Sequence, residues 1–256
     1  PKYAQHYVFN FAANWMKWRP VPIGILRQGN AWGLAFGTPM SETDFTHPKN
    51  KEKLYSLVDH LQRIAHIVGA EKVTLSGILP SFLEKNGKTV KGCDNRPPAL
   101  AVYESYKHLC QNNFSDVAVP AILLGGNGSV GKHIQAVFKL QQRSCHVVDP
   151  AGGLTSLPKE VKNKACILID VSRRDVLKTY ADNFWPEMVI LNETFPEPPK
   201  ALINNLKRKG IKTYHLAGVE GRVYPSLPYG YKNSVPCCAI HDANADIRPI
   251  IKELSI

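Results

Sequence analysis

Between residues 118 and 215, short apolar segments alternate with longer segments of helical periodicity. The apolar segments cover residues 118–124, 145–148, 165–169, 188–191 and 212–215, and the helical segments cover residues 128–142, 173–183 and 198–209. Alternation of this kind is typical of parallel strands joined by crossover helices, which bury both faces of the sheet. The sequence therefore predicts an α/β fold class with a Rossmann-type, doubly wound parallel sheet in this part of the chain.

The preceding part of the chain also mixes strand and helix patterns. Two apolar-rich segments are separated by Gly29-Asn30, a dipeptide that favours a two-residue hairpin. Further along, apolar residues recur at helical spacing, and prolines open a second helical segment. We expect strands at 21–28, 31–38 and 72–76, helices at 48–68 and 97–109, and a loop at 77–94.

These patterns predict three parts. An amino-terminal α/β domain that binds the substrate is expected over residues 1–116, and a Rossmann dinucleotide-binding domain over residues 117–235. The apolar spacing after Pro236 predicts a final helix over residues 236–256 that packs back on the cleft.

A glycine-rich turn follows the first apolar segment of the second domain. It reads Gly125-Gly126-Asn127-Gly128-Ser129-Val130-Gly131 and contains the spacing Gly-x-Gly-x-x-Gly. Between a strand and a helix, such glycines form a tight turn, let the backbone approach a pyrophosphate and let the helix pack closely on the strand. A purely structural turn can carry the same pattern, and S-adenosylmethionine or a nucleotide sugar can occupy a similar crevice. We expect a dinucleotide here, held by Gly126, Asn127, Gly128, Ser129, Val130 and Gly131.

Asp149 follows the next apolar segment, 18 residues after Gly131. An acid at this position can accept hydrogen bonds from the ribose hydroxyls of a dinucleotide. The cofactor is therefore expected to be NAD or NADP, and Asp149 favours NAD because it would repel the 2′-phosphate of NADP.

The composition is that of an ordinary globular protein with a strong positive charge. Of the 256 residues, 44% are hydrophobic and 21% are charged, which argues against disordered and low-complexity proteins. Lys and Arg number 32 and Asp and Glu number 21, a net charge of +11. This charge favours polyanions such as nucleic acid, dinucleotide or coenzyme A phosphates, or an acidic carrier protein. A solvated lysine-rich surface accounts for it equally well.

The sequence predicts neither a membrane span nor a metal site. Its apolar runs fall short of the roughly 18 residues that a spanning helix needs, and no secretory signal pattern opens the sequence given, so we expect a cytoplasmic protein. The cysteines show neither the Cys-x-x-Cys pairing nor the histidine spacing of zinc sites.

Cys237 and Cys238 are candidates for nucleophilic catalysis. On a helix beginning near Pro236, either thiol could share a face with His241. A thiol at a helix amino terminus beside a histidine has a lowered pKa and a more nucleophilic thiolate. A buried apolar thiol with a surface histidine is the alternative interpretation.

Several segments together resemble the long-chain fatty acyl-acyl carrier protein reductases of cyanobacteria. The resemblance rests on residues 69–78, on Asn95 before a helix, on the glycine-rich turn and on Cys237-Cys238-Ala239, and it extends in patches over about residues 60–245. It implies an NAD(P)-dependent oxidoreductase that reduces an acyl thioester to an aldehyde. Cys238 falls at the family's nucleophilic cysteine, so the implied catalytic residues are Cys238, His241 and Asn95. The implied substrate is a small or carrier-bound acyl thioester.

This chain departs from that family in two places. His241 stands where the family has an acid after its cysteine, and Asp149 disagrees with the NADPH preference that the resemblance implies. The two-domain order also resembles shikimate dehydrogenases and methylenetetrahydrofolate dehydrogenases, which transfer hydride without a thiol. In that case the loop ending at Asn95 would supply the polar groups.

A further alternative is a non-catalytic protein that binds nucleotides or nucleic acid through the same shell. The sequence contains no recognised nucleic-acid-binding motif and no interleaved run of aromatic and basic residues. Nucleic acid is therefore the less favoured partner.

Overall fold

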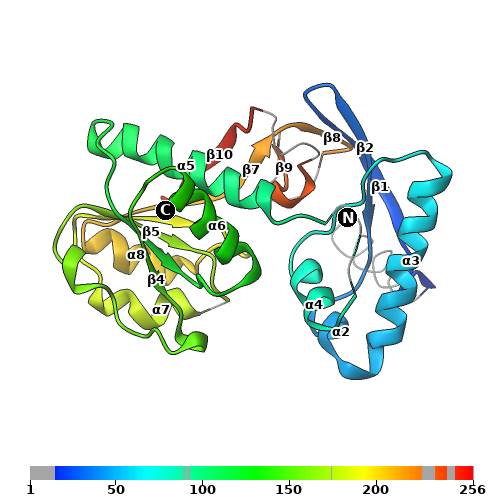
Figure 1. Cartoon of the computed structure of the whole chain (residues 1–256), viewed down its shortest axis with the longest axis horizontal. Coiled ribbons are helices and arrows are strands. Elements are labelled where there is room, and N and C mark those ends of the chain that lie inside the picture. The colour runs from blue at the N-terminus through cyan, green and yellow to red at the C-terminus, as the bar shows by residue number, and fades with distance from the viewer. Residues whose placement is uncertain are drawn as a thin grey trace. The chain divides into compact units, whose positions relative to one another are not determined.

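The computed structural model describes residues 15–88, 90, 93–173, 175–226, 234–240 and 246–255. The chain divides into two units. Unit 1 comprises Pro1–Asp94 and Gly221–His241, and unit 2 comprises Asn95–Glu220 and Asp242–Ile256. Each unit has a sheet of its own, so the expected mixed α/β fold class is confirmed (Figure 1).

The sheet of unit 1 is antiparallel. Strands β1 (Val21–Gln28) and β2 (Ala31–Gly37) form a hairpin through Gly29-Asn30, as the sequence predicts. Gly29 has a φ of 56°, a left-handed conformation that glycine adopts without steric cost. Strand β8 (Arg222–Tyr224) pairs with the other edge of β1 and gives the order β2-β1-β8.

The helices of unit 1 surround a small apolar core. Between residues 15 and 88 they are α2 (Glu42–Thr46), the 3-10 helix η1 (Pro48–Asn50), α3 (Lys51–Ile67) and α4 (Leu79–Lys85). Leu54, Leu57 and Val58 of α3 are buried and pack with Phe45 and Leu83 from the neighbouring helices.

The stretch between α3 and α4 differs from the sequence prediction. The expected strand at 72–76 is wrong, because this stretch has no ladder partner among the described residues, although Val73 and Leu75 pack on the helical core. The expected loop at 77–94 contains α4, since Pro80 lies in the first turn of that helix, where proline is tolerated.

The sheet of unit 2 is mostly parallel. Its strands follow the order β10-β7-β6-β5-β3-β4, and all neighbours are parallel except β10 and β7. The strands are β3 (Ala121–Leu124), β4 (Cys145–Val148), β5 (Cys166–Asp170), β6 (Met188–Asn192), β7 (Lys212–Glu220) and β10 (Pro249–Glu253). In the strand order 3-2-1-4-5-6 of dinucleotide-binding sheets, the third strand lies next to the second, on the same side of the first strand. In this protein the third parallel strand along the chain is β5. It lies next to the first, β3, on the side opposite to the second, β4.

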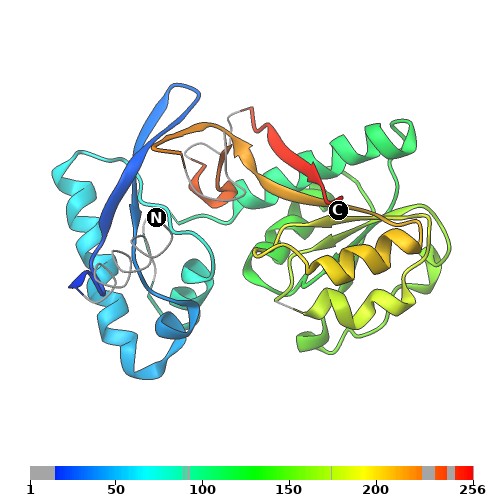
Figure 2. The same ribbon diagram turned by 180° about the vertical axis from the view of Figure 1, so that it is seen from behind.

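Helices cover both faces of this sheet. On one face lie α5 (Arg96–Phe114) and α6 (Ser129–Leu140), where Tyr103 and Tyr106 of α5 pack against Phe138 of α6 with ring centroids 5.2 Å and 4.8 Å apart. The other face carries α7 (Val176–Tyr180), the 3-10 helix η4 (Ala181–Asn183) and α8 (Lys200–Arg208), and in Figure 2 α7 and α8 lie in front of the strands. Leu168 of β5 and Ile190 of β6 belong to the apolar core between the sheet and these helices. Two more 3-10 helices, η2 (Pro150–Gly152) and η3 (Lys159–Val161), lie between β4 and β5.

The carboxyl-terminal part corrects two expectations. In place of the helix expected over 236–256, the described residues form the 3-10 helix η6 (Cys237–Ala239) and strand β10, which pairs antiparallel with β7. The short strand β9 (Ser234–Val235) precedes η6. The helix that we assigned to the substrate domain, α5, belongs to unit 2, and the segment 221–241 belongs to unit 1.

Candidate functional site

Two loops meet at the carboxyl edge of the parallel sheet in unit 2. Strand β3 has β4 on one side and β5 on the other, so the connections that leave β3 and β5 diverge at this edge. In open α/β sheets, ligands bind in the crevice formed at such a point. The two loops lie close together, since a Cβ atom on Gly125 would come within 2.8 Å of the Ser172 Cα.

The glycines of the first loop serve different purposes. A Cβ atom on Gly126 would lie 2.6 Å from Val147 Cγ1, and one on Gly131 would lie 2.6 Å from the carbonyl oxygens of Gly125 and Gly126. These positions need glycine because the loop, strand and helix pack closely together. A Cβ atom on Gly128 would meet only the Gly125 oxygen, at 3.3 Å. The backbone at Gly128 therefore borders open space.

Helix α6 begins directly at this open position. Gly128 is its N-cap residue and lacks a side chain that could cap the first turn. The first backbone N–H groups of any α-helix have no acceptor within the helix, and their dipoles favour an anion. The backbone N–H groups at the amino end of α6 therefore have the polarity that attracts an anion.

Asp149 connects the end of β4 to the glycine-rich loop. Its carboxylate accepts hydrogen bonds from the backbone N–H of Asn127, at 2.8 Å, and of Gly152, at 3.1 Å. The side chain of Asn127 lies against Gly152, where a Cβ atom would come within 2.2 Å of Asn127 Nδ2. Asp149 thus lies beside the glycine-rich loop and holds it in shape, and its contact with a ribose stays a prediction.

Asn95 lies at the amino end of α5 and contacts the same loop. Its Nδ2 atom donates a hydrogen bond to Ser129 Oγ at 2.6 Å, and Asn95 is the N-cap residue of its helix. The structure therefore brings together two of the predicted site residues that are 34 positions apart in the sequence.

Asp170 and Ser172, in the second loop, were not predicted. Asp170 ends β5 and is buried, and it accepts hydrogen bonds from Ser172 Oγ at 2.5 Å and from the Ser172 backbone N–H at 3.0 Å. Burial raises the pKa of Asp170 to about 6, although both hydrogen bonds act to lower it. A carboxylic acid with a pKa near neutral pH at a loop of this kind is suited to proton exchange. The signal in the sequence is an acid immediately after an apolar segment.

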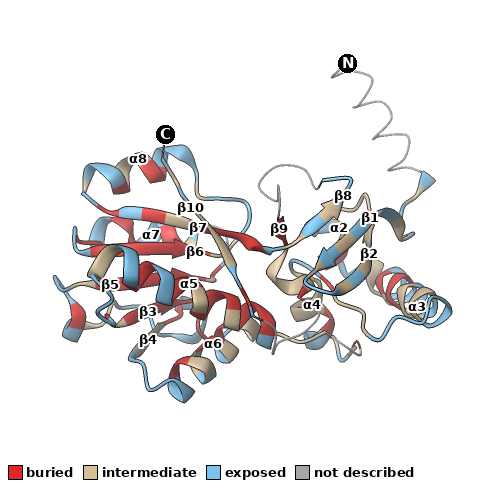
Figure 3. Ribbon diagram, turned by 90° about the horizontal axis from the view of Figure 1, so that it is seen from above, coloured by how far each residue is buried: buried red, intermediate tan, exposed pale blue. Residues whose placement is uncertain are grey.

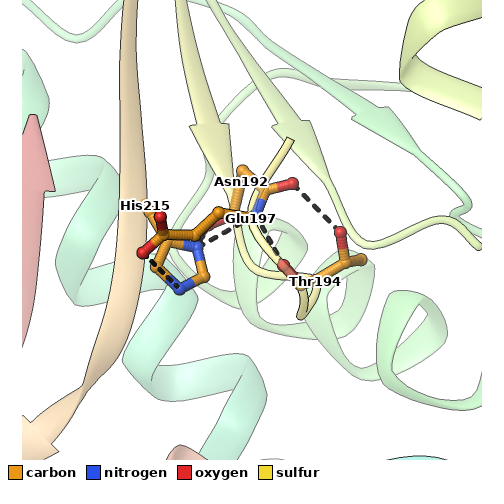
Figure 4. Close-up of polar contacts among 4 residues, drawn as sticks. All are labelled: Asn192, Thr194, Glu197 and His215. Atoms are coloured by element: carbon orange, nitrogen blue, oxygen red, sulfur yellow. Dashed lines mark hydrogen bonds and ion pairs between the residues drawn. The ribbon is translucent and has the colours of Figure 1, made fainter. Parts of the chain in front are cut away.

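A second group of polar side chains lies farther along the same edge (Figure 4). The register pairs Asp170 with Asn192 and Asn192 with His215, so these residues form a row across β5, β6 and β7. Asn192 Nδ2 lies 3.0 Å from His215 Nδ1 and donates to the Thr194 carbonyl oxygen at 2.6 Å, and Thr194 Oγ1 donates to Asn192 Oδ1 at 3.0 Å.

His215 is the buried member of this second group. Burial lowers the pKa of His215, which favours the neutral imidazole, and this effect is opposed by Glu197, whose Oε1 lies 4.0 Å from His215 Nε2. The group fixes the loop that leaves β6, at the edge where Asp170 lies.

The predicted thiol lies in unit 1. Cys238 is half-buried in η6, a single 3-10 turn, so the long helix that was expected to lower its pKa is absent from the described residues. Cys93 is a neighbour. Burial raises the pKa of Cys93, a hydrogen bond with the Leu75 backbone lowers it, and Cys238 raises it further. His241 lies outside the described residues.

None of the helices in the described residues is long and apolar enough to cross a membrane. Nor do three or more His, Cys, Asp or Glu side chains of the described ranges gather in a way that could hold a metal ion.

Comparisons of the chain with protein-family models, with curated proteins and with solved structures found no match.

Proposed function

We propose that unit 2 binds NAD or NADP at the glycine-rich loop and that the protein is an NAD(P)-dependent oxidoreductase. The observation that carries the proposal is the open backbone at Gly128, at the amino end of α6 and at the point where the loops of the sheet diverge. Ligands bind where the loops diverge in Rossmann-type sheets, and also in sheets with the strand order found here.

The residues present fit a dinucleotide. The first turn of α6 would hold the pyrophosphate, and Gly128 would give the phosphates access to the backbone. Asp149 lies beside Asn127, where its carboxylate would accept hydrogen bonds from a ribose. Once bound, the nicotinamide supplies or removes a hydride. Asp170, with its raised pKa, would hold or release a proton at the same edge of the sheet.

The resemblance to acyl-thioester reductases supports a substrate class. In this scheme the Cys238 thiolate attacks the acyl carbonyl carbon, the carrier thiolate leaves, and the acyl group becomes a thioester on Cys238. The dinucleotide, held at the first turn of α6, would supply the hydride that converts this thioester into the aldehyde and the free Cys238 thiolate. Backbone N–H groups near Cys238 would stabilise the tetrahedral oxyanion.

Hydride transfer without a thiol, as in shikimate-type dehydrogenases, is the second candidate. One contact favours it. Asn95 is hydrogen-bonded to Ser129 in the glycine-rich loop, so a polar side chain outside the dinucleotide motif already lies beside it. In this case Asn95 would position a hydroxyl or carbonyl group of the substrate.

A graded substitution tests dinucleotide binding. The Gly128→Val variant places a branched side chain where the pyrophosphate would lie, and we expect NADH and NADPH binding to be lost in calorimetric titration. The Gly128→Ala variant adds only one methyl group and should weaken binding less. Both variants should keep the circular dichroism of the parent. Unchanged affinity in Gly128→Val would exclude the site.

Mass spectrometry separates the two reactions. Incubation with acyl-coenzyme A in the absence of nicotinamide should add one acyl group to Cys238, and Cys238→Ser should lose thioester reduction while keeping its affinity for the dinucleotide. Cys237→Ser is the matched control and should remain active. Full activity of Cys238→Ser would refute the thiol route and favour the shikimate-type reaction.

A further inference from the structure

One face of the sheet in unit 1 combines aromatic, apolar and cationic side chains. The register pairs Arg27 with both Trp32 and Arg222, and it pairs Ile25 with both Leu34 and Tyr224. Residues paired in this way across an antiparallel sheet point to the same face. We define this aromatic-basic face by six residues: Ile25, Arg27, Trp32, Leu34, Arg222 and Tyr224.

The two aromatic rings of this face are strongly exposed. Trp32 is 67% exposed and Tyr224 is 81% exposed, and Ile25 and Leu34 between them are about half exposed. Figure 3 shows β1, β2 and β8 without any buried segment. Exposed apolar side chains that gather on one surface mark interaction sites.

The charged side chains of this face are all positive. Arg27 and Arg222 are both exposed, and β1, β2 and β8 contain no Asp or Glu. The Arg27 guanidinium lies over the Trp32 ring, 5.3 Å from its centroid. The whole chain has a net charge of +11, so the field around this face favours an anionic partner.

From the combination of exposed rings and arginines we infer that the aromatic-basic face binds single-stranded nucleic acid. Bases stack on Trp32 and Tyr224, which lie on the two outer strands and are separated by about 10 Å across the sheet. The arginines contact the phosphates, and the aliphatic side chains between the rings contact sugars and base edges. A single strand of nucleic acid offers both the flat surfaces of unpaired bases and the negative phosphates that these side chains recognise.

A second copy of the chain fits this face less well. The three strands have eight, seven and three residues. At about 4.8 Å between strands, they present roughly 300 Å². A stable interface buries about 800 Å² on each partner. Two such faces in contact would also bring arginines of both copies together without an acid on any of the three strands.

The aromatic-basic face shares no residue with the groups of the proposed reaction, because the dinucleotide site belongs to unit 2 and Cys238 belongs to η6. It also differs from the expectation drawn from the sequence, where the aromatic and basic residues are too dispersed to form a recognisable pattern. Strand pairing brings Trp32 and Tyr224 into one face, although they are far apart in the chain.

Fluorescence anisotropy with labelled oligo-dT and oligo-U strands tests the stacking. We expect Trp32→Ala and Tyr224→Ala each to weaken binding by about tenfold or more, and Trp32→Phe to restore most of the affinity because a ring remains. Trp15 is 72% exposed and lies outside this face, so Trp15→Ala is the matched control and should bind like the parent. Equal binding by Trp32→Ala and the parent would overturn the proposal.

A salt titration tests the arginines. Arg27→Gln should reduce the slope of log affinity against log salt by about 0.7, whereas Arg208→Gln, in the exposed last turn of α8, should leave the slope unchanged. A duplex of the same length should bind more weakly than the single strand, and equal binding would contradict stacking. Sedimentation of the free protein tests the alternative that the face binds a second copy of the chain. A dimer that is dissociated by Trp32→Ala and that binds no oligonucleotide would contradict the proposal.

Discussion

The two sheets of this protein differ in burial. Every residue of β3, β5 and β6 in unit 2 is buried, whereas no residue of β1 or β2 in unit 1 is buried. Helices cover both faces of the sheet in unit 2, so its central strands are continuous apolar runs. In the sheet of unit 1, exposed and half-buried residues alternate along the hairpin.

The difference shows where each unit can carry function. In the fully buried strands β5 and β6, Asp170 and Asn192 stand at the carboxyl ends, and Asp149 follows β4 at the same edge. The rigid sheet therefore positions loops. In unit 1 the sheet itself presents side chains such as Trp32 to the solvent.

The largest effect is expected from truncating a buried leucine. Leu168 in the middle of β5 is 0% exposed, and Leu168→Ala should lower the free energy of unfolding by about 3 kcal/mol because it leaves a cavity. Leu34 in β2 is 49% exposed, and Leu34→Ala should cost about 0.5 kcal/mol or less. Urea unfolding measures both variants. A cost for Leu34→Ala as large as that of Leu168→Ala would show that the hairpin is covered in solution.

The second effect is a pH dependence caused by Asp170. Its pKa is raised from 3.8 to about 6 in the folded protein, so the folded state binds more protons than the unfolded state between these pH values. This contribution to stability is fully present below pH 4 and is lost as the pH rises through 6, by at most about 3 kcal/mol.

Asp170→Asn removes the titrating group and should flatten that slope in urea unfolding measured from pH 4 to pH 7. Asp182→Asn, at an exposed aspartate of η4, is the control and should keep the slope of the parent. A slope that survives in Asp170→Asn would assign the titration to a different residue.

The third effect separates packing from access within the glycine-rich loop. A methyl group on Gly131 would lie 2.6 Å from two backbone oxygens, so Gly131→Ala should destabilise unit 2 by about 2 kcal/mol. Gly128→Ala has one contact, at 3.3 Å, and should change stability by about 0.5 kcal/mol or less. Thermal unfolding in the absence of nucleotide compares them. Equal costs would mean that Gly128 is also needed for packing.

The sequence predicts the strands β3 to β6 well and the edge strand β10 poorly. Apolar runs locate β3 to β6 within a few residues, and in β3, β5 and β6 burial on both faces leaves no other composition. For β7 the apolar run marks the start of the strand but ends before Glu220. Strand β10 at the sheet edge contains Pro249, Lys252 and Glu253 and is only half-buried, so its pattern is weak. The same weakness made a helix after Pro236 a reasonable but wrong interpretation.

The candidate site divides in the same way. The glycine-rich loop follows a strand directly, so its position is set by local sequence. Asn95 and Ser129, which we predicted as site residues, are hydrogen-bonded to each other. Asn192 and His215 lie on different strands, 23 residues apart. Their proximity depends on the register of β6 and β7, which no local pattern specifies.

The smallest effect concerns a helix cap in unit 1. Ser41 precedes α2, and its Oγ accepts a hydrogen bond from the Asp44 backbone N–H at 3.2 Å, while the Ser41 N–H donates to Asp44 Oδ2 at 2.9 Å. Such a capping box supplies partners to backbone groups that a short helix cannot pair internally. Unit 1 has the smaller core, so local contacts of this kind should matter there.

Ser41→Ala should destabilise unit 1 by about 1 kcal/mol, because the Asp44 N–H loses its acceptor. Trp18 packs edge-on against Phe45 of α2, with centroids 5.9 Å apart, and its fluorescence should report the loss. The indole of Trp185 is buried in unit 2 and serves as the internal reference. The variants Trp185→Phe and Trp18→Phe assign each signal. If Ser41→Ala shifts only the Trp18 transition, the two units unfold independently and the comparison between them holds for stability. A shared shift would show that the small helical core of unit 1 is stabilised by unit 2.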